Sequence, residues 1–189
     1  MKKIILTSLL PTLLIFSGFV FAQQNNSVQQ SEVQAVSSVD LKRYAGKWFE
    51  IASYPNKSQK NCVGNTTTTY TQKVDGHLAI LNRCVMKNGT TQSMKTEAEV
   101  ADKTTNAKFD VRSAPGDYWI IDLDTDYKYA AVGDKKRESL WILSREPQMN
   151  DAVYQNILRR VEKMGFKPGK LVKTPQNLEI IKGGVIEKQ

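Results

Sequence analysis

Residues 64–101 read GNTTTTYTQKVDGHLAILNRCVMKNGTTQSMKTEAEVA, a segment in which three apolar and β-branched runs alternate with two short turn sequences. The first turn sequence is Asp75-Gly76 and the second is Asn88-Gly89. Both dipeptides accept the positive φ angles of a type I′ turn, whose twist matches that of paired antiparallel strands. The segment therefore predicts two consecutive β-hairpins that share their middle strand, each closed by a type I′ turn.

Runs of the same kind continue on both sides of this segment, at a spacing of roughly 8 to 12 residues that is typical of all-β sandwiches and barrels. Residues 114–117 and 133–136 supply further short turns, so consecutive strands are expected to pair as a meander. The expected strands are Lys47–Ser53, Gly64–Gln72, His77–Met86, Thr91–Ala101, Ala107–Ser113, Asp117–Leu123, Tyr127–Val132 and Ser139–Ser144.

A meander of this kind leaves two exposed edges unless it closes on itself, and closure removes those edges. A ring of about eight strands is wide enough to be filled by side chains or to hold one small ligand. The predicted fold class is therefore all-β, an eight-stranded antiparallel up-and-down β-barrel with one C-terminal α-helix packed outside.

The helix is expected over Asp151–Met164, with Asn150 placed to cap its start and Gly165 to end it. Its apolar residues recur at intervals of three and four and form one stripe, which must lie against the outside of the barrel. The stripe consists of Val153, Tyr154, Ile157, Leu158, Val161 and Met164. Lys170–Thr174 is expected to add a short ninth strand.

The first 22 residues have the order of a secretory signal peptide, with cleavage expected after Ala22. Residues 23–38 are rich in Gln, Ser and Asn and predict a flexible linker. The barrel and helix then occupy residues 39–175, and residues 176–189 are expected to form a C-terminal tail. Because no cysteine stands near the expected cleavage site to carry a lipid, we expect a periplasmic or secreted protein that is not lipid-anchored.

The chain carries a formal net charge of +8. Its lysines are scattered over turns, and its aromatic residues alternate with apolar rather than basic residues, which predicts a solvated basic surface and no nucleic-acid partner. The alternative interpretation of the charge is attraction to anionic lipid or to an acidic partner, including peripheral contact with a membrane. We expect a monomer or a weak dimer.

The chain contains two cysteines, Cys62 and Cys84. In an exported protein a pair of cysteines is more often bridged than free, because the compartment is oxidising. We therefore predict a Cys62–Cys84 disulfide.

Three segments together resemble the signatures of the lipocalin family, and in particular of its small bacterial branch. They are residues 40–51 (DLKRYAGKWFEI), in which a short helix leads into a Gly-x-Trp motif, Thr125-Asp126-Tyr127, and residues 140–145 (LWILSR). Asn82-Arg83-Cys84 is also similar to a phrase common in the bacterial branch. The best-known bacterial members are anchored lipoproteins of the outer membrane, and the missing cysteine at the expected cleavage site departs from that pattern.

The signatures have structural roles by this resemblance, and their residues are not expected to contact a ligand. Gly46 lets the chain cross the closed end of the barrel closely. Trp48 points inward and plugs that end, with the Arg145 guanidinium laid on its indole ring. Thr125 and Asp126, followed by Tyr127, are expected to form a tight turn by hydrogen-bonding their own backbone.

The ligand-binding residues are expected on the inward faces of four strands, where alternation along each strand decides the face. On the sixth strand both faces hold apolar groups, and we choose the face of Tyr118 over that of Trp119. Ordinary core packing is the alternative role for every one of these residues. The expected set is Trp141, Leu143, Tyr118, Ile120, Leu78, Ile80, Asn82, Glu50 and Ala52.

The resemblance implies binding, storage or transport of a small apolar ligand, a fatty acid or a lysophospholipid, in the cell envelope. With a single histidine, His77, and two cysteines expected to be bridged, we expect no catalytic residue, no metal site, no cofactor and no enzyme activity. Asp122, Asp124 and Asp126 are explained better by turn chemistry than by a bound cation. One alternative function is an envelope interaction or inhibitor protein, and another is a thiol-dependent lipid-modifying enzyme that uses Cys84.

Overall fold

The computed structural model describes residues 32–112, 117–181 and 183–188. The expected signal peptide, residues 1–22, and the first part of the expected linker lie outside the described residues. Of the helices in the described ranges, none is long and apolar enough to span a lipid bilayer.

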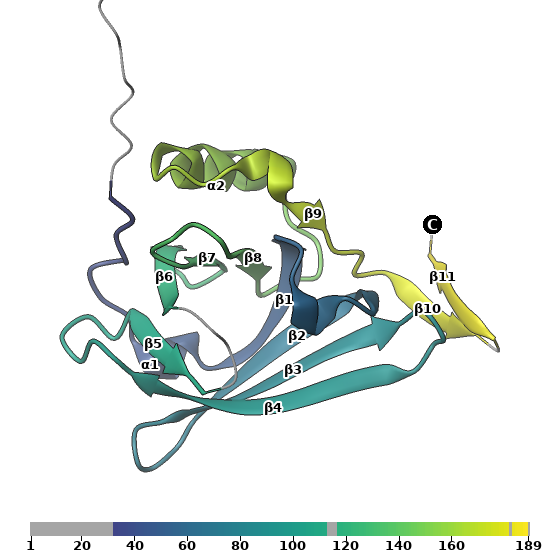
Figure 1. Cartoon of the computed structure of the whole chain (residues 1–189), viewed down its shortest axis with the longest axis horizontal. Coiled ribbons are helices and arrows are strands. Elements are labelled where there is room, and N and C mark those ends of the chain that lie inside the picture. The colour runs from purple at the N-terminus through teal and green to yellow at the C-terminus, as the bar shows by residue number, and fades with distance from the viewer. Residues whose placement is uncertain (1–31, 113–116, 182, 189) are drawn as a thin grey trace, which may run out of the picture.

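Antiparallel strands β1 to β8 form a closed ring, which confirms the predicted fold class (Figure 1). Each strand pairs with the next one in the sequence, and β8 returns to pair with β1. All expected runs match the observed strands to within two residues at each end. The strands are β1 (Gly46–Ser53), β2 (Cys62–Gln72), β3 (Leu78–Met86), β4 (Thr91–Val100), β5 (Lys108–Val111), β6 (Asp117–Leu123), β7 (Tyr129–Gly133) and β8 (Leu140–Ser144).

The predicted type I′ turns are wrong, because only the glycine of each turn has a positive φ angle. In the β2–β3 hairpin Gly76 has φ +85°, and its N–H donates to the Lys73 carbonyl at 3.1 Å. The Lys73 N–H in turn donates to the His77 carbonyl at 2.8 Å. This is a type I turn followed by a left-handed glycine, the usual three-residue hairpin loop. The Asp75 side chain favours it by accepting the His77 N–H at 3.0 Å. The β3–β4 hairpin repeats the arrangement with Met86, Asn88, Gly89 and Thr90.

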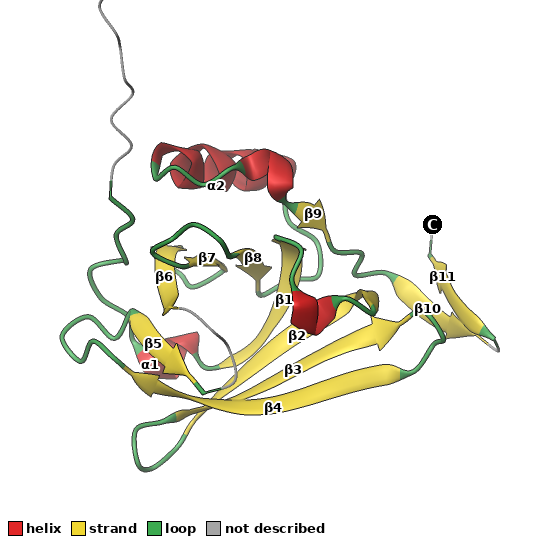
Figure 2. Cartoon of the chain, viewed as in Figure 1, coloured by secondary structure: helices red, strands yellow, loops and turns green. Residues whose placement is uncertain are grey.

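Helix α2 (Asp151–Lys163) packs outside the ring, over β6, β7 and β8, as Figure 2 shows. Asn150 caps it as expected, since its side chain accepts the Ala152 N–H at 2.9 Å. The apolar stripe of α2 and the outward side chains of the strands form one buried layer, here called the outer cluster. Its buried members are Val33, Ala52, Tyr54, Ile121, Ala131, Leu140, Ile142, Tyr154, Ile157, Val161 and Phe166.

Short elements complete the two ends of the barrel. Helix α1 (Leu41–Tyr44) crosses the closed end before β1, and the 3₁₀ turn η1 (Lys57–Gln59) lies in the β1–β2 loop at the open end. A second 3₁₀ turn, η2 (Pro168–Lys170), leads into the expected ninth strand, which is present as β9 (Val172–Lys173) and pairs with β1.

Strands β1 and β2 pair over only part of their length. Their ladder stops at Phe49 opposite Thr67, short of the open end. Beyond that point the side-chain amide of Gln176 joins the two strands, donating to the Glu50 carbonyl at 2.7 Å and to the Thr66 carbonyl at 2.8 Å. The segment after β9 therefore completes the ring at this place.

Residues 32–38, the last part of the expected linker, lie against the barrel. Val33 is only 3 % exposed in the outer cluster, and the Val36 N–H donates to the Ile120 carbonyl at 2.8 Å. These few apolar residues, set in a polar sequence, are enough to hold residues 32–38 against the barrel.

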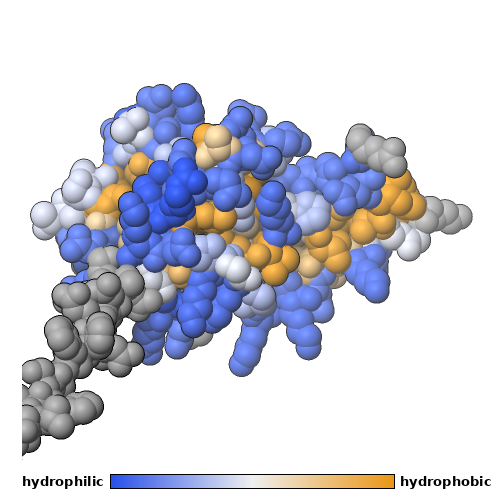
Figure 3. All heavy atoms as spheres, turned by 90° about the horizontal axis from the view of Figure 1, so that it is seen from above, coloured by the Kyte–Doolittle hydropathy of each residue, from blue (hydrophilic) through white to orange (hydrophobic). Residues whose placement is uncertain are grey.

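The expected C-terminal tail also contains ordered structure. Strands β10 (Leu178–Ile181) and β11 (Gly184–Glu187) form a separate two-stranded hairpin. Asn65 holds the start of this hairpin to β2, because its side chain donates to the Leu178 carbonyl and accepts the Leu178 N–H. Ile180, Ile181 and Ile186 remain about half exposed there. Figure 3 shows the apolar surface that gathers at this end of the molecule.

Candidate functional site

The closed end is sealed by the Gly-x-Trp segment and Arg145. Trp48 is fully buried, and its indole N–H donates to the Tyr44 carbonyl at 2.8 Å. The Arg145 guanidinium carbon lies 3.8 Å from the Trp48 ring centre, and its Nη1 donates to the Lys47 carbonyl at 2.9 Å. Gly46 adopts φ +96°, and a Cβ there would lie 3.2 Å from the Arg145 Nη1. A side chain at Gly46 would thus be strained and would press on the guanidinium.

The tight turn after β6 is held by Asp124, so the expectation that Thr125 and Asp126 hold it is wrong. The Asp124 carboxylate accepts the N–H of Asp126 at 3.0 Å and the N–H of Lys128 at 3.1 Å. Tyr127 takes the left-handed conformation, with φ +60°. Asp124 lies one residue before Thr125, and the left-handed conformation of Tyr127 brings the N–H groups of the turn within reach of its carboxylate.

Most of the expected ligand-binding residues lie together inside the ring, in a layer here called the inner cluster. Leu78, Ile80, Ile120 and Leu143 are buried in it. On β6 the chosen face is the inward one, because Tyr118 and Ile120 belong to the inner cluster and Ile121 to the outer cluster.

Tyr118 and Trp141 stand at the open end of the inner cluster. Their rings are stacked, with centroids 6.5 Å apart and an interplanar angle of 26°. Both side chains belong to the inner cluster yet keep part of their surface exposed. This stacked pair is therefore an apolar surface inside the ring that stays partly exposed.

Sequence reasoning missed a group of tyrosines beneath this pair. The hydroxyl of Tyr118 forms hydrogen bonds with the hydroxyls of Tyr44, at 3.3 Å, and of Tyr70. Burial raises the pKa of Tyr70 to about 12, and burial also raises the pKa of Tyr44 and Tyr118 well above the usual 10. All three phenols therefore stay neutral. The face of Tyr70 follows from alternation with Thr68, but their association with Tyr44 has no signal in the local sequence.

Ala52 lies outside the ring, so its expected role as an inward residue is wrong. A β-bulge interrupts the pairing of β1 with β8 between Glu50 and Ala52, and the extra residue turns Ala52 into the outer cluster. Glu50, before the bulge, keeps its place opposite Leu143 of the inner cluster. Asn82 keeps the expected inward face, because it pairs with Thr68, which in turn pairs with Trp48; it is half-buried, and its carbonyl oxygen accepts the Thr68 hydroxyl at 2.8 Å.

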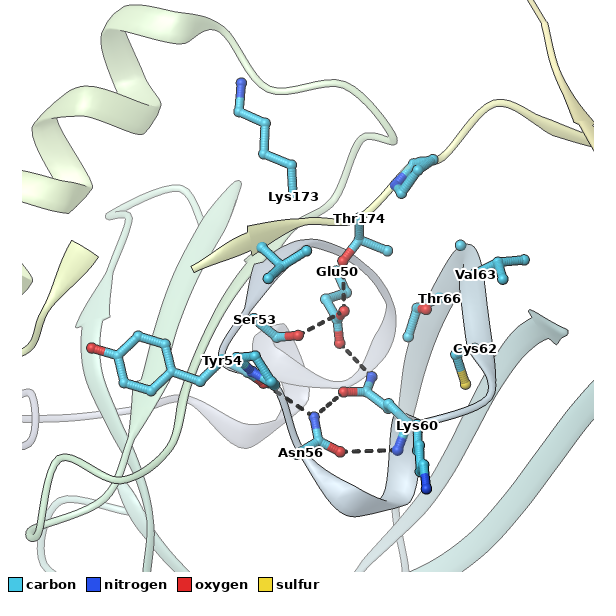
Figure 4. Close-up of a pocket in the computed structure, with 15 residues that line it drawn as sticks. Glu50, Ser53, Tyr54, Asn56, Lys60, Cys62, Val63, Thr66, Lys173 and Thr174 are labelled. Carbon is cyan, nitrogen blue, oxygen red and sulfur yellow. Dashed lines mark hydrogen bonds between the residues drawn. The ribbon is translucent and has the colours of Figure 1, made fainter. Parts of the chain in front are cut away.

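A pocket of about 370 Å³ lies at the open end, between β1, the β1–β2 loop, the start of β2 and the segment around β9 (Figure 4). Glu50 stands in its wall and is only 5 % exposed. The Glu50 carboxylate accepts hydrogen bonds from Ser53, Thr174 and Gln59 (Figure 4). The sequence placed Glu50 inward but gave no sign of these donors, two of which come from a loop and from the far end of the chain.

The two cysteines form the predicted disulfide, Cys62–Cys84, with the Cα atoms 5.6 Å apart. The bridge ties the start of β2 to β3, and Cys62 lines the same pocket. Since Cys84 has no free thiol, the thiol-dependent alternative has no nucleophile.

The remaining polar candidates have structural partners. Asp122 accepts the Arg160 guanidinium of α2 at 2.7 Å, and Asp124 accepts backbone N–H groups, so these carboxylates do not converge. His77 lies between Asp75 and Glu99 on the outer surface. Across the described ranges, no group of three or more His, Cys, Asp or Glu residues is arranged to hold a metal ion.

Comparison with known proteins identifies relatives along most of the chain. The family model described as a lipocalin-like domain matches residues 39–176. Temperature-induced lipocalin-1 of Arabidopsis thaliana is 34% identical over 160 residues, covering 79% of this chain and 86% of the relative. Outer membrane lipoprotein Blc of Escherichia coli K12 is 33% identical over 144 residues, covering 74% of this chain and 81% of the relative.

Solved structures share the fold at lower identity. Insecticyanin from the tobacco hornworm aligns with a TM-score of 0.62 at 23% identity, covering 76% of this chain and 84% of that chain. Apocrustacyanin C1 aligns with a TM-score of 0.57 at 14% identity, covering 71% of this chain and 78% of that one.

Proposed function

Because the chain belongs to the lipocalin family, which binds small hydrophobic ligands, we propose that it binds a single-chain lipid, a fatty acid or a lysophospholipid, in the cell envelope. The observation that carries this proposal is the stacked pair of Tyr118 and Trp141. An aromatic pair that is inside a ring of strands and still partly exposed offers an apolar surface to a ligand without any unfolding.

The chemistry of the two ends of the site supports an amphiphile. Below the aromatic pair the inner cluster consists of aliphatic and aromatic side chains, the chemistry that suits an acyl chain. The open end presents the polar pocket around Glu50, which suits a headgroup. A lipid with one chain satisfies both surfaces at once.

The cell envelope is proposed on two grounds. Residues 1–22 have the order of a signal peptide. The relative from Escherichia coli is named an outer membrane lipoprotein. We propose that this chain is periplasmic or secreted, without a lipid anchor, because no cysteine stands near the expected cleavage site after Ala22.

Native mass spectrometry of the protein purified from its own host tests the proposal directly. We expect a species heavier than the protein by the mass of one single-chain lipid, which dissociates on activation and is identified by fragmentation. Protein that carries no lipid, and that takes up none when fatty acids and lysophospholipids are added, would contradict the proposal.

The second candidate, an envelope interaction protein, is favoured by one specific feature. Ile180, Ile181 and Ile186 are between 44% and 53% exposed on the C-terminal hairpin. Exposed apolar groups of this kind often mark a contact with another molecule. Removal of residues 178–189 distinguishes the candidates, because lipid binding inside the ring is expected to survive it and association with a partner is not.

A further inference from the structure

The Glu50 carboxylate is held in place by neutral donors only. Its Oε1 accepts the hydroxyls of Ser53, at 3.1 Å, and of Thr174, at 2.6 Å. Its Oε2 accepts the side-chain amide of Gln59 at 2.6 Å. A carboxylate offers about four acceptor positions, so one position on Oε2 is left over.

No ion pair to this carboxylate forms within the described part of the chain, although Lys60 and Lys173 line the same pocket. None of the ion pairs found there includes Glu50, although the side chain is 5 % exposed. A buried charge is costly unless an opposite charge pairs with it. Glu50 therefore has no direct ion-pair partner there, and its unused acceptor position is available to a donor that enters the pocket.

The pocket is placed so that a bound lipid brings its headgroup to Glu50. In the ladder between β1 and β8, Glu50 lies opposite Leu143 and Ser53 lies opposite Trp141. Two residues of the pocket wall are therefore direct cross-strand neighbours of inner-cluster residues. Lys60 is exposed and lines the pocket beside Gln59, with its side chain directed away from Glu50 (Figure 4).

From this arrangement we propose that Glu50 forms a subsite for an ammonium group, so that the protein prefers single-chain lipids that carry an amine. The inference rests on the proposed function and narrows its substrate class. The ammonium group donates to the free position on Oε2 and neutralises the carboxylate. Two kinds of ligand supply this chemistry, a zwitterionic lysophospholipid and a long-chain amine, and only the first also carries a phosphate.

Competition against a fluorescent fatty acid tests the proposal on the unmodified protein. The probes carry the same palmitoyl or palmityl chain: lysophosphatidylethanolamine, lysophosphatidylglycerol, hexadecylamine and palmitic acid, each below its critical micelle concentration. We expect lysophosphatidylethanolamine to bind about tenfold more tightly than lysophosphatidylglycerol, the ratio expected for one charge-assisted hydrogen bond. Equal affinity of hexadecylamine and lysophosphatidylethanolamine assigns the preference to the ammonium group alone, and weaker binding of hexadecylamine adds a phosphate contribution.

The Glu50→Gln variant distinguishes recognition of the ammonium group from a purely structural role, in which Glu50 only connects β1, the β1–β2 loop and the segment after β9. We expect it to lose the preference for lysophosphatidylethanolamine over lysophosphatidylglycerol, whereas a purely structural role of Glu50 would weaken the binding of both lipids alike. Glu162→Gln removes the same charge from the exposed surface of α2 and is expected to keep the preference. If Glu50→Gln does not fold, the selectivity of the unmodified protein still decides the question.

Two results overturn the inference in different ways. Equal affinity for lysophosphatidylethanolamine and lysophosphatidylglycerol in the unmodified protein rejects the ammonium subsite and leaves lipid binding intact. If none of the four probes displaces the fluorescent fatty acid, and the fatty acid itself does not bind, the proposed function fails and the inference falls with it.

Discussion

The guanidinium carbon of Arg145 lies 3.8 Å from the centre of the Trp48 ring, and its nitrogens donate hydrogen bonds to the backbone carbonyls of Arg43, Lys47 and Tyr127. These carbonyls belong to α1, to the start of β1 that directly follows it, and to the β6–β7 turn, which lies far away in the sequence. One side chain thus ties the α1–β1 segment to the β6–β7 turn at the closed end. The indole beneath it fills the space that they enclose.

The first prediction concerns this end of the barrel. Trp48→Ala is expected to lower the free energy of unfolding by about 3–5 kcal/mol, because a buried aromatic side chain is lost and a cavity is left. The measurement is urea denaturation followed by circular dichroism. Trp119→Ala is the matched control, since Trp119 lies on the outer side and is only partly buried. Equal losses for both variants would contradict the special role of Trp48.

The second prediction concerns the aromatic pair at the open end. Titration with palmitic acid is expected to change the tryptophan fluorescence, because Trp141 is the partly exposed indole of the inner cluster. Trp141→Phe is expected to abolish the change, whereas Trp119→Phe keeps it. A signal that survives in Trp141→Phe and disappears in Trp119→Phe would place the ligand outside the ring.

The third prediction concerns the disulfide. The bridge joins residues 22 apart in the sequence, and closing a loop of this size stabilises a protein by about 3 kcal/mol in the chain-entropy model. The double variant Cys62→Ala/Cys84→Ala is expected to unfold at a lower guanidinium concentration by the corresponding amount. Adding a reductant is expected to destabilise the unmodified protein and to leave the double variant unchanged. If the reductant does not change the guanidinium midpoint of the unmodified protein, the disulfide does not make this contribution to stability.

The fourth prediction concerns pH. The imidazole of His77 lies 3.0 Å from the Asp75 carboxylate and 3.1 Å from the Glu99 carboxylate. The hydrogen bond to Asp75, followed by the one to Glu99, raises the pKa of His77 above its usual 6.5. Since His77 is the only histidine of the chain, a single imidazole resonance reports this pKa in an NMR titration.

The sign of the effect on stability follows from that direction. A raised pKa means that folding favours the protonated imidazole, so the stabilisation is complete below pH 6.5 and is lost as the pH rises through the folded-state value. His77→Gln is therefore expected to lower the urea midpoint near pH 5 and to have no effect near pH 9. If His77→Gln lowers the urea midpoint more near pH 9 than near pH 5, the carboxylates of Asp75 and Glu99 do not stabilise the protonated imidazole.

Sequence patterns were sufficient for the architecture because alternation and turn residues act locally. The strand bounds, the capping of α2 by Asn150 and the Cys62–Cys84 pair all depend on residue types and spacings that can be read along the chain. The inward choice of Tyr118 on β6 also followed from alternation, with Ile120 beside it.

The errors lie where one residue shifts the register or where distant segments meet. The bulge after Glu50 reverses the face of Ala52, because the prediction assumed strict alternation and a bulge adds one extra residue to the strand. The hairpin turns were misassigned because Asp75 and Asn88 accept backbone N–H groups instead of adopting positive φ. The donors to Glu50 were missed because Gln59 and Thr174 reach it only after the barrel has closed.

The amide of Gln176, which joins the Glu50 and Thr66 carbonyls, has a consequence for the order of assembly. Because synthesis runs from the N-terminus, a ribosome releases residue 176 only after strands β1 to β8 have been made. The strands can begin to pair earlier, but the link between β1 and β2 at the open end needs Gln176, a residue close to the C-terminus. A chain that ends before Gln176 therefore lacks the side chain that joins β1 to β2 at the open end of the barrel.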